Sequence, residues 1–118
     1  AQLLHQREFL RAPDLIVPEV TNIAWKKCVR GEITPAQAQD IATAIRHCLP
    51  KLHPSGELNE RALHIALALT HPVHDCLYIA CADVAGGVLV TADAGLCAAV
   101  RETPYAGLVR HLSDWAGA

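Results

Sequence analysis

The chain has 118 residues and a mass of 12.7 kDa, so it is long enough for one compact core and too short for two ordinary domains. Apolar residues make up 52% and charged residues only 19%, which indicates that part of the surface is reserved for a partner or a second copy. The formal net charge of −2, without any block of Lys and Arg, does not indicate a basic nucleic-acid-binding domain.

The first third of the chain predicts a helix, a short strand and a second helix. Residues 1–10 have helical apolar spacing, and Pro13 closes that pattern. The apolar run DLIV at 14–17 predicts a strand that stops before Pro18 and Glu19. Residues 19–30 place apolar side chains on one helical face, and Gly31 follows as a helix end.

The middle of the chain predicts two more helices. TPAQ at 34–37 is typical of a helix start, with Thr34 as N-cap and Gln37 completing a capping box. The expected buried stripe of this helix comprises Ala38, Ile41, Ile45, Cys48 and Leu49. KLHPSG at 51–56 predicts a short strand or loop. A helix then follows, with its buried face formed by Leu58, Ala62, Ile65, Ala66 and Leu69.

The last third alternates helices and short strands. Residues 74–85 are apolar nearly all round, as expected of a buried helix, and VLVT at 88–91 predicts a fully buried strand. A helix over 94–102 and a strand near GLVRHL at 107–112 complete the order. This alternation predicts an α/β fold with three layers, in which helices flank a central, mostly parallel sheet.

Three carboxylates fall at predicted helix starts. Glu19 follows the first strand, Asp93 follows VLVT, and Asp75 opens the apolar helix. Taken singly, each is most simply an acid that complements a helix dipole or caps it. Because ligands of parallel sheets collect beyond the carboxyl ends of the strands, we expect the three to share one edge. Converging carboxylates need a neutralising cation, and hard Mg²⁺ or Mn²⁺ prefers oxygen ligands.

These segments resemble a known family. LIVPEVTNIAWKKCVRGEIT, HDCLYIACADVAGGVLVTADAGL and the spacing between them are similar to PIN-domain ribonucleases, especially the VapC-type toxins of bacterial toxin–antitoxin pairs. The likeness runs over essentially all 118 residues, which we therefore treat as a single PIN-like domain. The family's motifs match Glu19 with Asn22, then Asp75 with an apolar helix containing Tyr78, and lastly Thr91 with Asp93.

The resemblance implies a metal-dependent endonuclease that hydrolyses RNA phosphodiesters with a metal-activated water. Asp75, Asp93 and Glu19 would hold Mg²⁺ or Mn²⁺, and Thr91 would orient a carboxylate or a water. Cationic side chains on the second helix, Lys26, Lys27 and Arg30, would contact the RNA backbone, although a solvated helix face explains them equally well. The implied partners are an antitoxin and a second copy of the chain. The absence of an apolar run of ~18 residues and of a targeting signature predicts a cytoplasmic protein without a membrane anchor.

One part of the family pattern is not found. Family members begin with a central strand that bears the first catalytic Asp, and the sequence here opens at AQLLHQREFL. We therefore expect the first strand to be missing from this chain, which would leave unpaired edges on its neighbours. The sequence of the full gene product tests this expectation.

Other chemistries fit the sequence less well. A zinc site could use His47, Cys48 and His53, or His71 and His74, but these spacings match no common structural zinc pattern. Neither serine lies in a nucleophile elbow, and Cys76 and Cys81 fall within the apolar helix, where inert thiols are expected. The remaining alternative is a catalytically silent PIN-like module that binds an antitoxin or dimerises.

Overall fold

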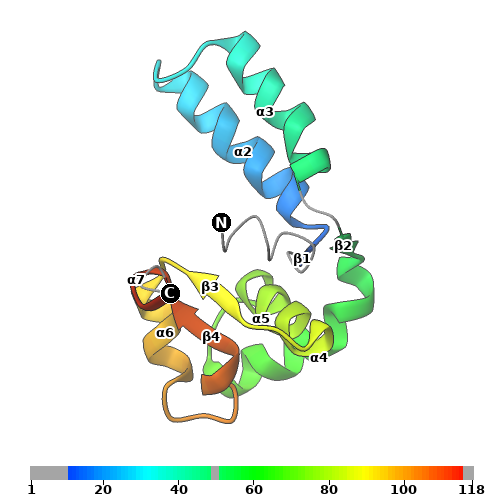
Figure 1. The fold of residues 1–118 in the computed structure, drawn as a ribbon, viewed down its shortest axis with the longest axis vertical. Coiled ribbons are helices and arrows are strands. Elements are labelled where there is room, and N and C mark those ends of the chain that lie inside the picture. Colours follow the sequence, from blue (N-terminus) through cyan, green and yellow to red (C-terminus); the bar gives the residue numbers. More distant parts are fainter. Residues whose placement is uncertain (1–10, 49–50, 116–118) are drawn as a thin grey trace. The chain divides into compact units, whose positions relative to one another are not determined.

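The structure is a computed structural model that describes residues 11–48 and 51–115. It divides between Pro54 and Ser55 into two compact units (Figure 1). The helix expected over residues 1–10 lies outside the described residues. The single domain over 1–118 stays a prediction.

The first unit is a helical hairpin carried by a pair of strands. Strands β1 (Arg11–Pro13) and β2 (Lys51–His53) are parallel, and α2 (Ile16–Val29) and α3 (Pro35–Cys48) form the connection between them (Figure 1). The predicted capping box at the start of α3 is confirmed. The Gln37 amide donates to Thr34 Oγ1 at 3.1 Å, and the Thr34 amide donates to Gln37 Oε1 at 2.9 Å.

The strand predicted at 14–17 is wrong. The strand ends at Pro13, and Ile16 already begins α2. The expectation fails because a proline after a short apolar run fits the first turn of a helix as well as the end of a strand. In the structure Pro18 lies in the first turn of the helix, where an amide hydrogen has no intrahelical acceptor and proline is tolerated. The helix therefore begins three residues earlier than expected, and Glu19 lies in its first turn as predicted.

The buried stripe predicted for α3 is also wrong. Ala38, Ile41 and Ile45 are only half-buried, Cys48 is exposed, and Leu49 lies outside the described residues. Among the described residues, α3 packs mainly on α2, and a helix with a single partner cannot enclose its side chains. On α2 the one buried residue is Ala24.

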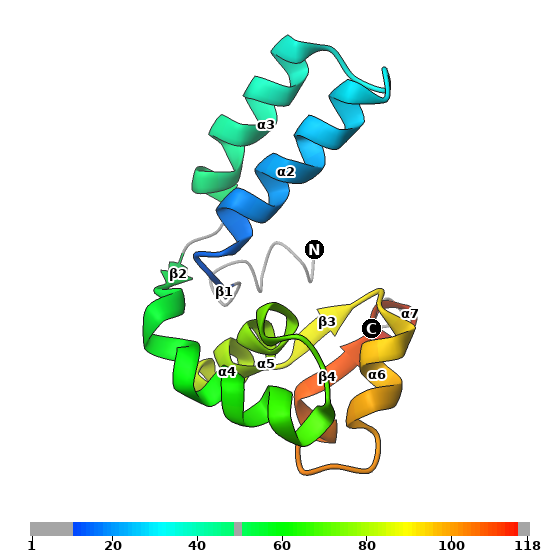
Figure 2. The same ribbon diagram turned by 180° about the vertical axis from the view of Figure 1, so that it is seen from behind.

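The second unit contains the remaining elements. In chain order these are α4 (Ser55–Leu69), α5 (Val73–Ala85), β3 (Leu89–Thr91), α6 (Ala94–Val100), the 3₁₀ helix η2 (Ala106–Leu108), β4 (Val109–His111) and α7 (Leu112–Trp115). Strands β3 and β4 lie side by side in both views and are parallel, with Leu89 opposite Val109 and Thr91 opposite His111 (Figures 1 and 2). The crossover between them runs through α6, which packs against β4.

The core of the second unit lies between α4 and α5. The buried face predicted for α4 is confirmed for Leu58, Ala62, Ile65 and Ala66, while Leu69 is half-buried. Helix α5 buries Cys76, Leu77, Ile79, Ala80, Cys81 and Ala82. Small alanines let the two helices approach closely around Ile65 and Ile79, which are fully buried. Replacing either isoleucine by alanine would lower the free energy of unfolding by about 2–5 kcal/mol.

The end of α5 is set by glycine. Gly86 has φ 70, a left-handed conformation that residues with a Cβ rarely adopt, and the Gly87 amide donates to the Ala82 carbonyl at 2.8 Å. This turn ends α5 and leads the chain into β3. The GG pair at 86–87 therefore ends the helix.

Helices α4 and α5 are also the apolar segments that bear on membrane insertion. Among the described residues no single helix is long and apolar enough to cross a bilayer. Only α4 and α5 taken together reach that length and composition, and they are bent by 115° with respect to each other.

The mixed α/β class with parallel strand pairs is confirmed. The structure has one parallel pair in each unit, β1 with β2 and β3 with β4. The arrangement of three layers around one central sheet stays a prediction.

Candidate metal centre

Asp93 lies directly beyond the end of β3 and begins helix α6. As N-cap it keeps an extended backbone, and its Oδ1 accepts the Leu96 amide hydrogen at 3.1 Å. Its own amide donates to Thr91 Oγ1 at 3.1 Å. Among the described residues the second carboxylate oxygen of Asp93 has no hydrogen-bond partner, and the side chain is exposed. Asp93 is therefore a helix cap with one oxygen left for a ligand.

Asp75 lies in the first turn of α5, where the sequence predicted it. Its carboxylate is about one-third exposed, and its Oδ2 accepts a hydrogen bond from His71 Nε2 at 3.0 Å. A second histidine, His74, is more distant, with its Nε2 3.8 Å from Asp75 Oδ1 and most of its ring in solvent. His71 therefore makes the closer contact with this carboxylate.

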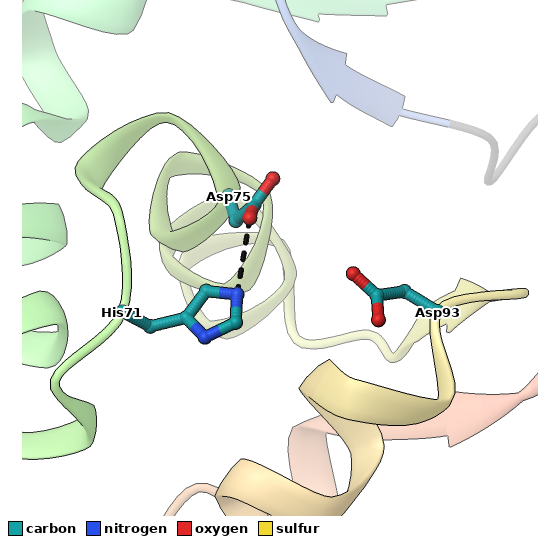
Figure 3. Close-up of side chains that lie close together, drawn as sticks. All are labelled: His71, Asp75 and Asp93. Carbon is teal, nitrogen blue, oxygen red and sulfur yellow. Dashed lines mark hydrogen bonds and ion pairs between the residues drawn. The ribbon is translucent and has the colours of Figure 1, made fainter.

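His71, Asp75 and Asp93 converge. Each of the three offers one ligand atom, and these atoms all lie within 4.8 Å of one another. Figure 3 shows the Asp93 carboxylate directed across a gap toward His71 and Asp75, which come from the start of α5 and the link before it. Asp75 and Asp93 also line a cavity of about 250 Å³, which is completed by Tyr78, Leu89, Val90, Thr91 and Leu96. Asp75, Thr91 and Asp93 therefore line the same cavity, and their role in a functional site stays a prediction.

The negative charge of Asp75 also acts on the buried cysteine next to it in the sequence, Cys76. Burial, and to a lesser degree the negative charge of Asp75, raises the pKa of the Cys76 thiol above its ordinary value of 9.0. Cys76 is fully buried and Cys81 nearly so, which confirms that both are core residues. Without a metal ion, Cys76 is consequently a protonated thiol at neutral pH, as expected of an inert core cysteine.

The donor set fits a divalent cation. Two carboxylates supply negative charge and oxygen atoms, and one imidazole supplies a nitrogen. Among the residues that the structure describes, the zinc alternative from His47, Cys48 and His53 is not part of this cluster. His71, which the sequence indicated only in a zinc pair with His74, is part of it.

The other predicted site residues lie in the first unit. Glu19 and Asn22 lie one turn apart in the first half of α2. That Glu19 shares one edge with Asp75 and Asp93 stays a prediction. The three cationic residues at the end of that helix are exposed: Lys26, Lys27 and Arg30. Lys27 forms an ion pair with Glu32 at 3.6 Å, and an exposed pair of this kind contributes only about 0–1 kcal/mol.

Comparison with known proteins identifies the family. The chain is 31% identical over 90 residues to ribonuclease VapC3 of Pyrobaculum aerophilum, an alignment that covers 75% of this chain and 69% of that protein. The chain belongs to the VapC ribonuclease family. No family model matches the VapC-type chain. The resemblance noted from the motifs around Glu19, Asp75 and Asp93 is therefore supported by an alignment over most of the sequence.

Sequence reasoning did not assign His71 to the carboxylate site of this VapC-type chain. The available signal was the spacing in HPVHD, where His71 precedes Asp75 by four residues. That spacing alone does not predict a contact, because His71 lies before the first residue of α5 and its direction depends on the link between α4 and α5.

Proposed function

We propose that this chain is the toxin of a type II toxin–antitoxin pair, a metal-dependent endonuclease that hydrolyses RNA phosphodiesters. The observation that supports it most is the meeting of Asp75 and Asp93 at the pocket beyond β3, in a chain of the VapC ribonuclease family. Acidic residues at the carboxyl end of a parallel strand are well placed to bind a ligand through a cation. We place the protein in the cytoplasm, where its RNA substrate would be found.

Asp75 and Asp93 would hold the cation, with Glu19 as a third carboxylate. A divalent cation, when bound, supplies the positive charge that admits a phosphodiester to an acidic pocket and makes a water more acidic, and Mg²⁺ or Mn²⁺ suits these oxygens. The hydrogen bond from the Leu96 amide to Asp93 Oδ1, which caps α6, fixes the position of the Asp93 carboxylate.

Thr91 has a positioning role in this proposal. Its Oγ1 accepts the Asp93 amide hydrogen at 3.1 Å, so the short turn from β3 into α6 is fixed. The hydroxyl hydrogen of Thr91 is then available to an acceptor in the pocket that Thr91 lines. On this proposal the acceptor is a carboxylate oxygen or a water that attacks phosphorus.

Helix α2 supplies the remaining contacts. Asn22 would support Glu19, and Lys26, Lys27 and Arg30 would bind RNA phosphates, since they are exposed along the second half of the helix. Sequence-independent contacts of this kind add affinity that falls as salt is raised.

The partners of the chain would be its antitoxin and a second copy of itself. Two exposed apolar pairs, each spaced by one helical turn, support such contacts: Trp25 with Val29 on α2, and Leu63 with Leu67 on α4.

The test is an RNA-cleavage assay with Mg²⁺ or Mn²⁺ on the protein expressed from its full gene. Asp93→Asn keeps the size of the side chain and its ability to cap a helix, but removes the charge that helps hold the cation. We expect a loss of about 100-fold or more, since even residues that only support a metal ligand typically contribute about 10–100-fold. The matched control is Asp40→Asn, the same change at an exposed position of α3.

The outcomes separate an enzyme from a scaffold. A parent that cuts RNA, an Asn variant at position 93 that does not, and retained antitoxin binding by both would support the nuclease. If the parent cuts no RNA with any divalent cation, or Asp93→Asn cuts as well as Asp40→Asn, Asp93 is only a helix cap. The chain is then a silent PIN-like module that binds its partner without catalysis.

A further inference from the structure

His71 lies between the two helices that form the core of the second unit. The link from α4 to α5 consists of Thr70, His71 and Pro72, and the His71 ring faces Asp75, with its Nε2 3.0 Å from Asp75 Oδ2 (Figure 3). The side chain is only one-fifth exposed. Its neighbours Thr70 and Pro72 are exposed, so His71 is the least exposed residue of this link.

The backbone holds the ring in this direction. Thr70 has φ 53, a left-handed conformation that threonine adopts rarely, and it turns the chain back at the end of α4. The His71 amide donates to the Ala66 carbonyl at 3.1 Å, which closes this turn. Backbone strain of this kind persists where the surrounding structure requires it, and such positions cluster at functional sites. Here the strained turn at Thr70 places the His71 ring beside the carboxylate of Asp75.

The spacing of the three residues suits a shared cation. Two neighbouring ligands at right angles, each about 2.1 Å from a cation, are about 3 Å apart. The separation of His71 Nε2 and Asp75 Oδ2, 3.0 Å, matches this value. The Asp93 ligand atom lies within 4.8 Å of both, near the roughly 4.2 Å that separates opposite ligands of one cation, so a small movement of its side chain would complete the set. Without a cation, Nε2–H donates to the Asp75 carboxylate, so the same atoms are held together in advance. Cation binding at Nε2 would require the neutral ring to change tautomer, with its proton moving to Nδ1.

We propose that the imidazole of His71 is a nitrogen ligand of the cation bound by Asp75 and Asp93, and that it makes the site select a transition metal such as Mn²⁺ over Mg²⁺. The inference rests on the proposed metal dependence and adds a ligand to the carboxylates. Imidazole nitrogen binds first-row transition metals, whereas Mg²⁺ prefers oxygen ligands and keeps its waters. His71 therefore decides which cation the carboxylates hold.

The test measures cation binding directly. The metal-free protein is titrated with Mn²⁺ and separately with Mg²⁺ by calorimetry, and the Mn²⁺ form is examined by pulsed electron paramagnetic resonance for coupling to a ¹⁴N nucleus. Two variants are compared with the parent. His71→Gln can still donate a hydrogen bond to Asp75 but removes the imidazole, and His74→Gln makes the same change at the exposed histidine beside Asp75.

We expect the parent to bind Mn²⁺ more tightly than Mg²⁺ and to show one coupled imidazole nitrogen. His71→Gln should lose the nitrogen coupling and about 10-fold or more in Mn²⁺ affinity, with little change for Mg²⁺. His74→Gln should keep both. Thermal denaturation checks that each variant folds, and if His71→Gln does not fold, the nitrogen coupling of the parent with His74→Gln still decides the question.

Failure of this inference is distinguishable from failure of the proposed function. Mn²⁺ bound without nitrogen coupling, or His71→Gln weakening both cations by the same factor, would mean that His71 only positions Asp75, and the proposed nuclease would stand. A parent that binds neither cation would overturn the proposed metal dependence, and the nitrogen ligand with it.

Discussion

The carboxylate of Asp93 and the amide of Leu96 form a hydrogen bond of 3.1 Å that closes the first turn of α6, and it uses only one of the two carboxylate oxygens. The same side chain therefore performs a structural task through Oδ1 and faces His71 and Asp75 (Figure 3). An acid at a helix start is usually explained by capping alone. Here capping fixes the side chain beside the other ligands, so the two explanations are compatible.

The two tasks of Asp93 predict different effects of two substitutions on stability. Asp93→Asn should leave the free energy of unfolding within a few tenths of a kcal/mol of the parent, because asparagine caps as well as aspartate. Asp93→Ala removes the acceptor for the Leu96 amide and should lower it by about 1 kcal/mol. Urea denaturation of the metal-free protein measures both. Equal stability of the Asn and Ala variants would show that the cap contributes nothing.

Several elements could be predicted because their apolar pattern fits only one type of secondary structure. Helix α5 was expected within one residue of its observed start, since an apolar run of this length followed by GG fits a buried helix and little else. The strand expected at 14–17 failed because a run of only three apolar residues fits both a strand and a first helical turn, and Pro18 is acceptable to either. The stripe of α3 failed because spacing predicts a face but not whether a partner covers it.

The candidate site was predicted in part for a similar reason. Asp75 and Asp93 follow directly from element boundaries, since each marks the start of a helix next to β3. The part played by His71 could not be predicted, because its direction depends on the left-handed backbone of Thr70, and threonine gives no sign of that conformation as glycine would. That Glu19 belongs to the same site as Asp75 and Asp93 stays a prediction.

The left-handed backbone of Thr70 predicts that Thr70→Gly is stabilising. Glycine adopts φ 53 without the Cβ clash that threonine incurs, and its larger chain entropy when unfolded offsets only part of this gain. We expect the free energy of unfolding to rise by about 0.5–1 kcal/mol. Ala68→Gly, an exposed position in α4, should instead lower it by about 0.5–1 kcal/mol. Two variants that shift in the same direction would contradict strain at Thr70.

The buried thiol of Cys76 predicts a pH dependence of stability. Burial and the charge of Asp75 raise the pKa of Cys76 above 9.0 in the folded chain, so above that pH the unfolded chain ionises first. This contribution to stability is fully present below pH 9.0 and is lost as the pH rises through the folded pKa.

Denaturation curves at increasing pH check this prediction. Cys76→Ser should flatten the fall of the unfolding free energy above pH 9.0, because serine does not ionise there, and Cys48→Ser controls for the loss of one thiol at the surface. Identical pH profiles for parent and Cys76→Ser would argue against a raised pKa.

The exposed apolar residues of α4 predict self-association. Leu67 is 73% exposed and Leu63, one turn before it, is 49% exposed, so a partner surface would bury both. Sedimentation velocity should show a dimer, and Leu67→Glu should shift it toward monomer with an unfolding free energy within about 0.5 kcal/mol of the parent. Ala68→Glu places the same charge at the next position around the helix and should disturb the dimer less. A clean monomer at high concentration would count against this surface.

Gly95 predicts a direct link between helix packing and cation binding. A Cβ at this second residue of α6 would lie 3.2 Å from Asp93 Oδ1, closer than ordinary contact, so Gly95→Ala must displace the carboxylate. Gly56 is the second residue of α4, and a Cβ there meets nothing within 4 Å. Gly56→Ala should therefore raise the free energy of unfolding by about 0.4–1 kcal/mol and leave cation affinity unchanged.

Gly95→Ala should lower Mn²⁺ affinity by about 10-fold, the range seen when the support of a metal ligand is disturbed. Its effect on stability should be smaller than that of Gly56→Ala, because the gain in helix propensity is offset by the crowded cap. Calorimetric titration with Mn²⁺ and urea denaturation compare the two variants. If Gly95→Ala binds Mn²⁺ like the parent while Asp93→Asn does not, the carboxylate can move without loss, and the position set by the cap is not what gives Asp93 its affinity for the cation.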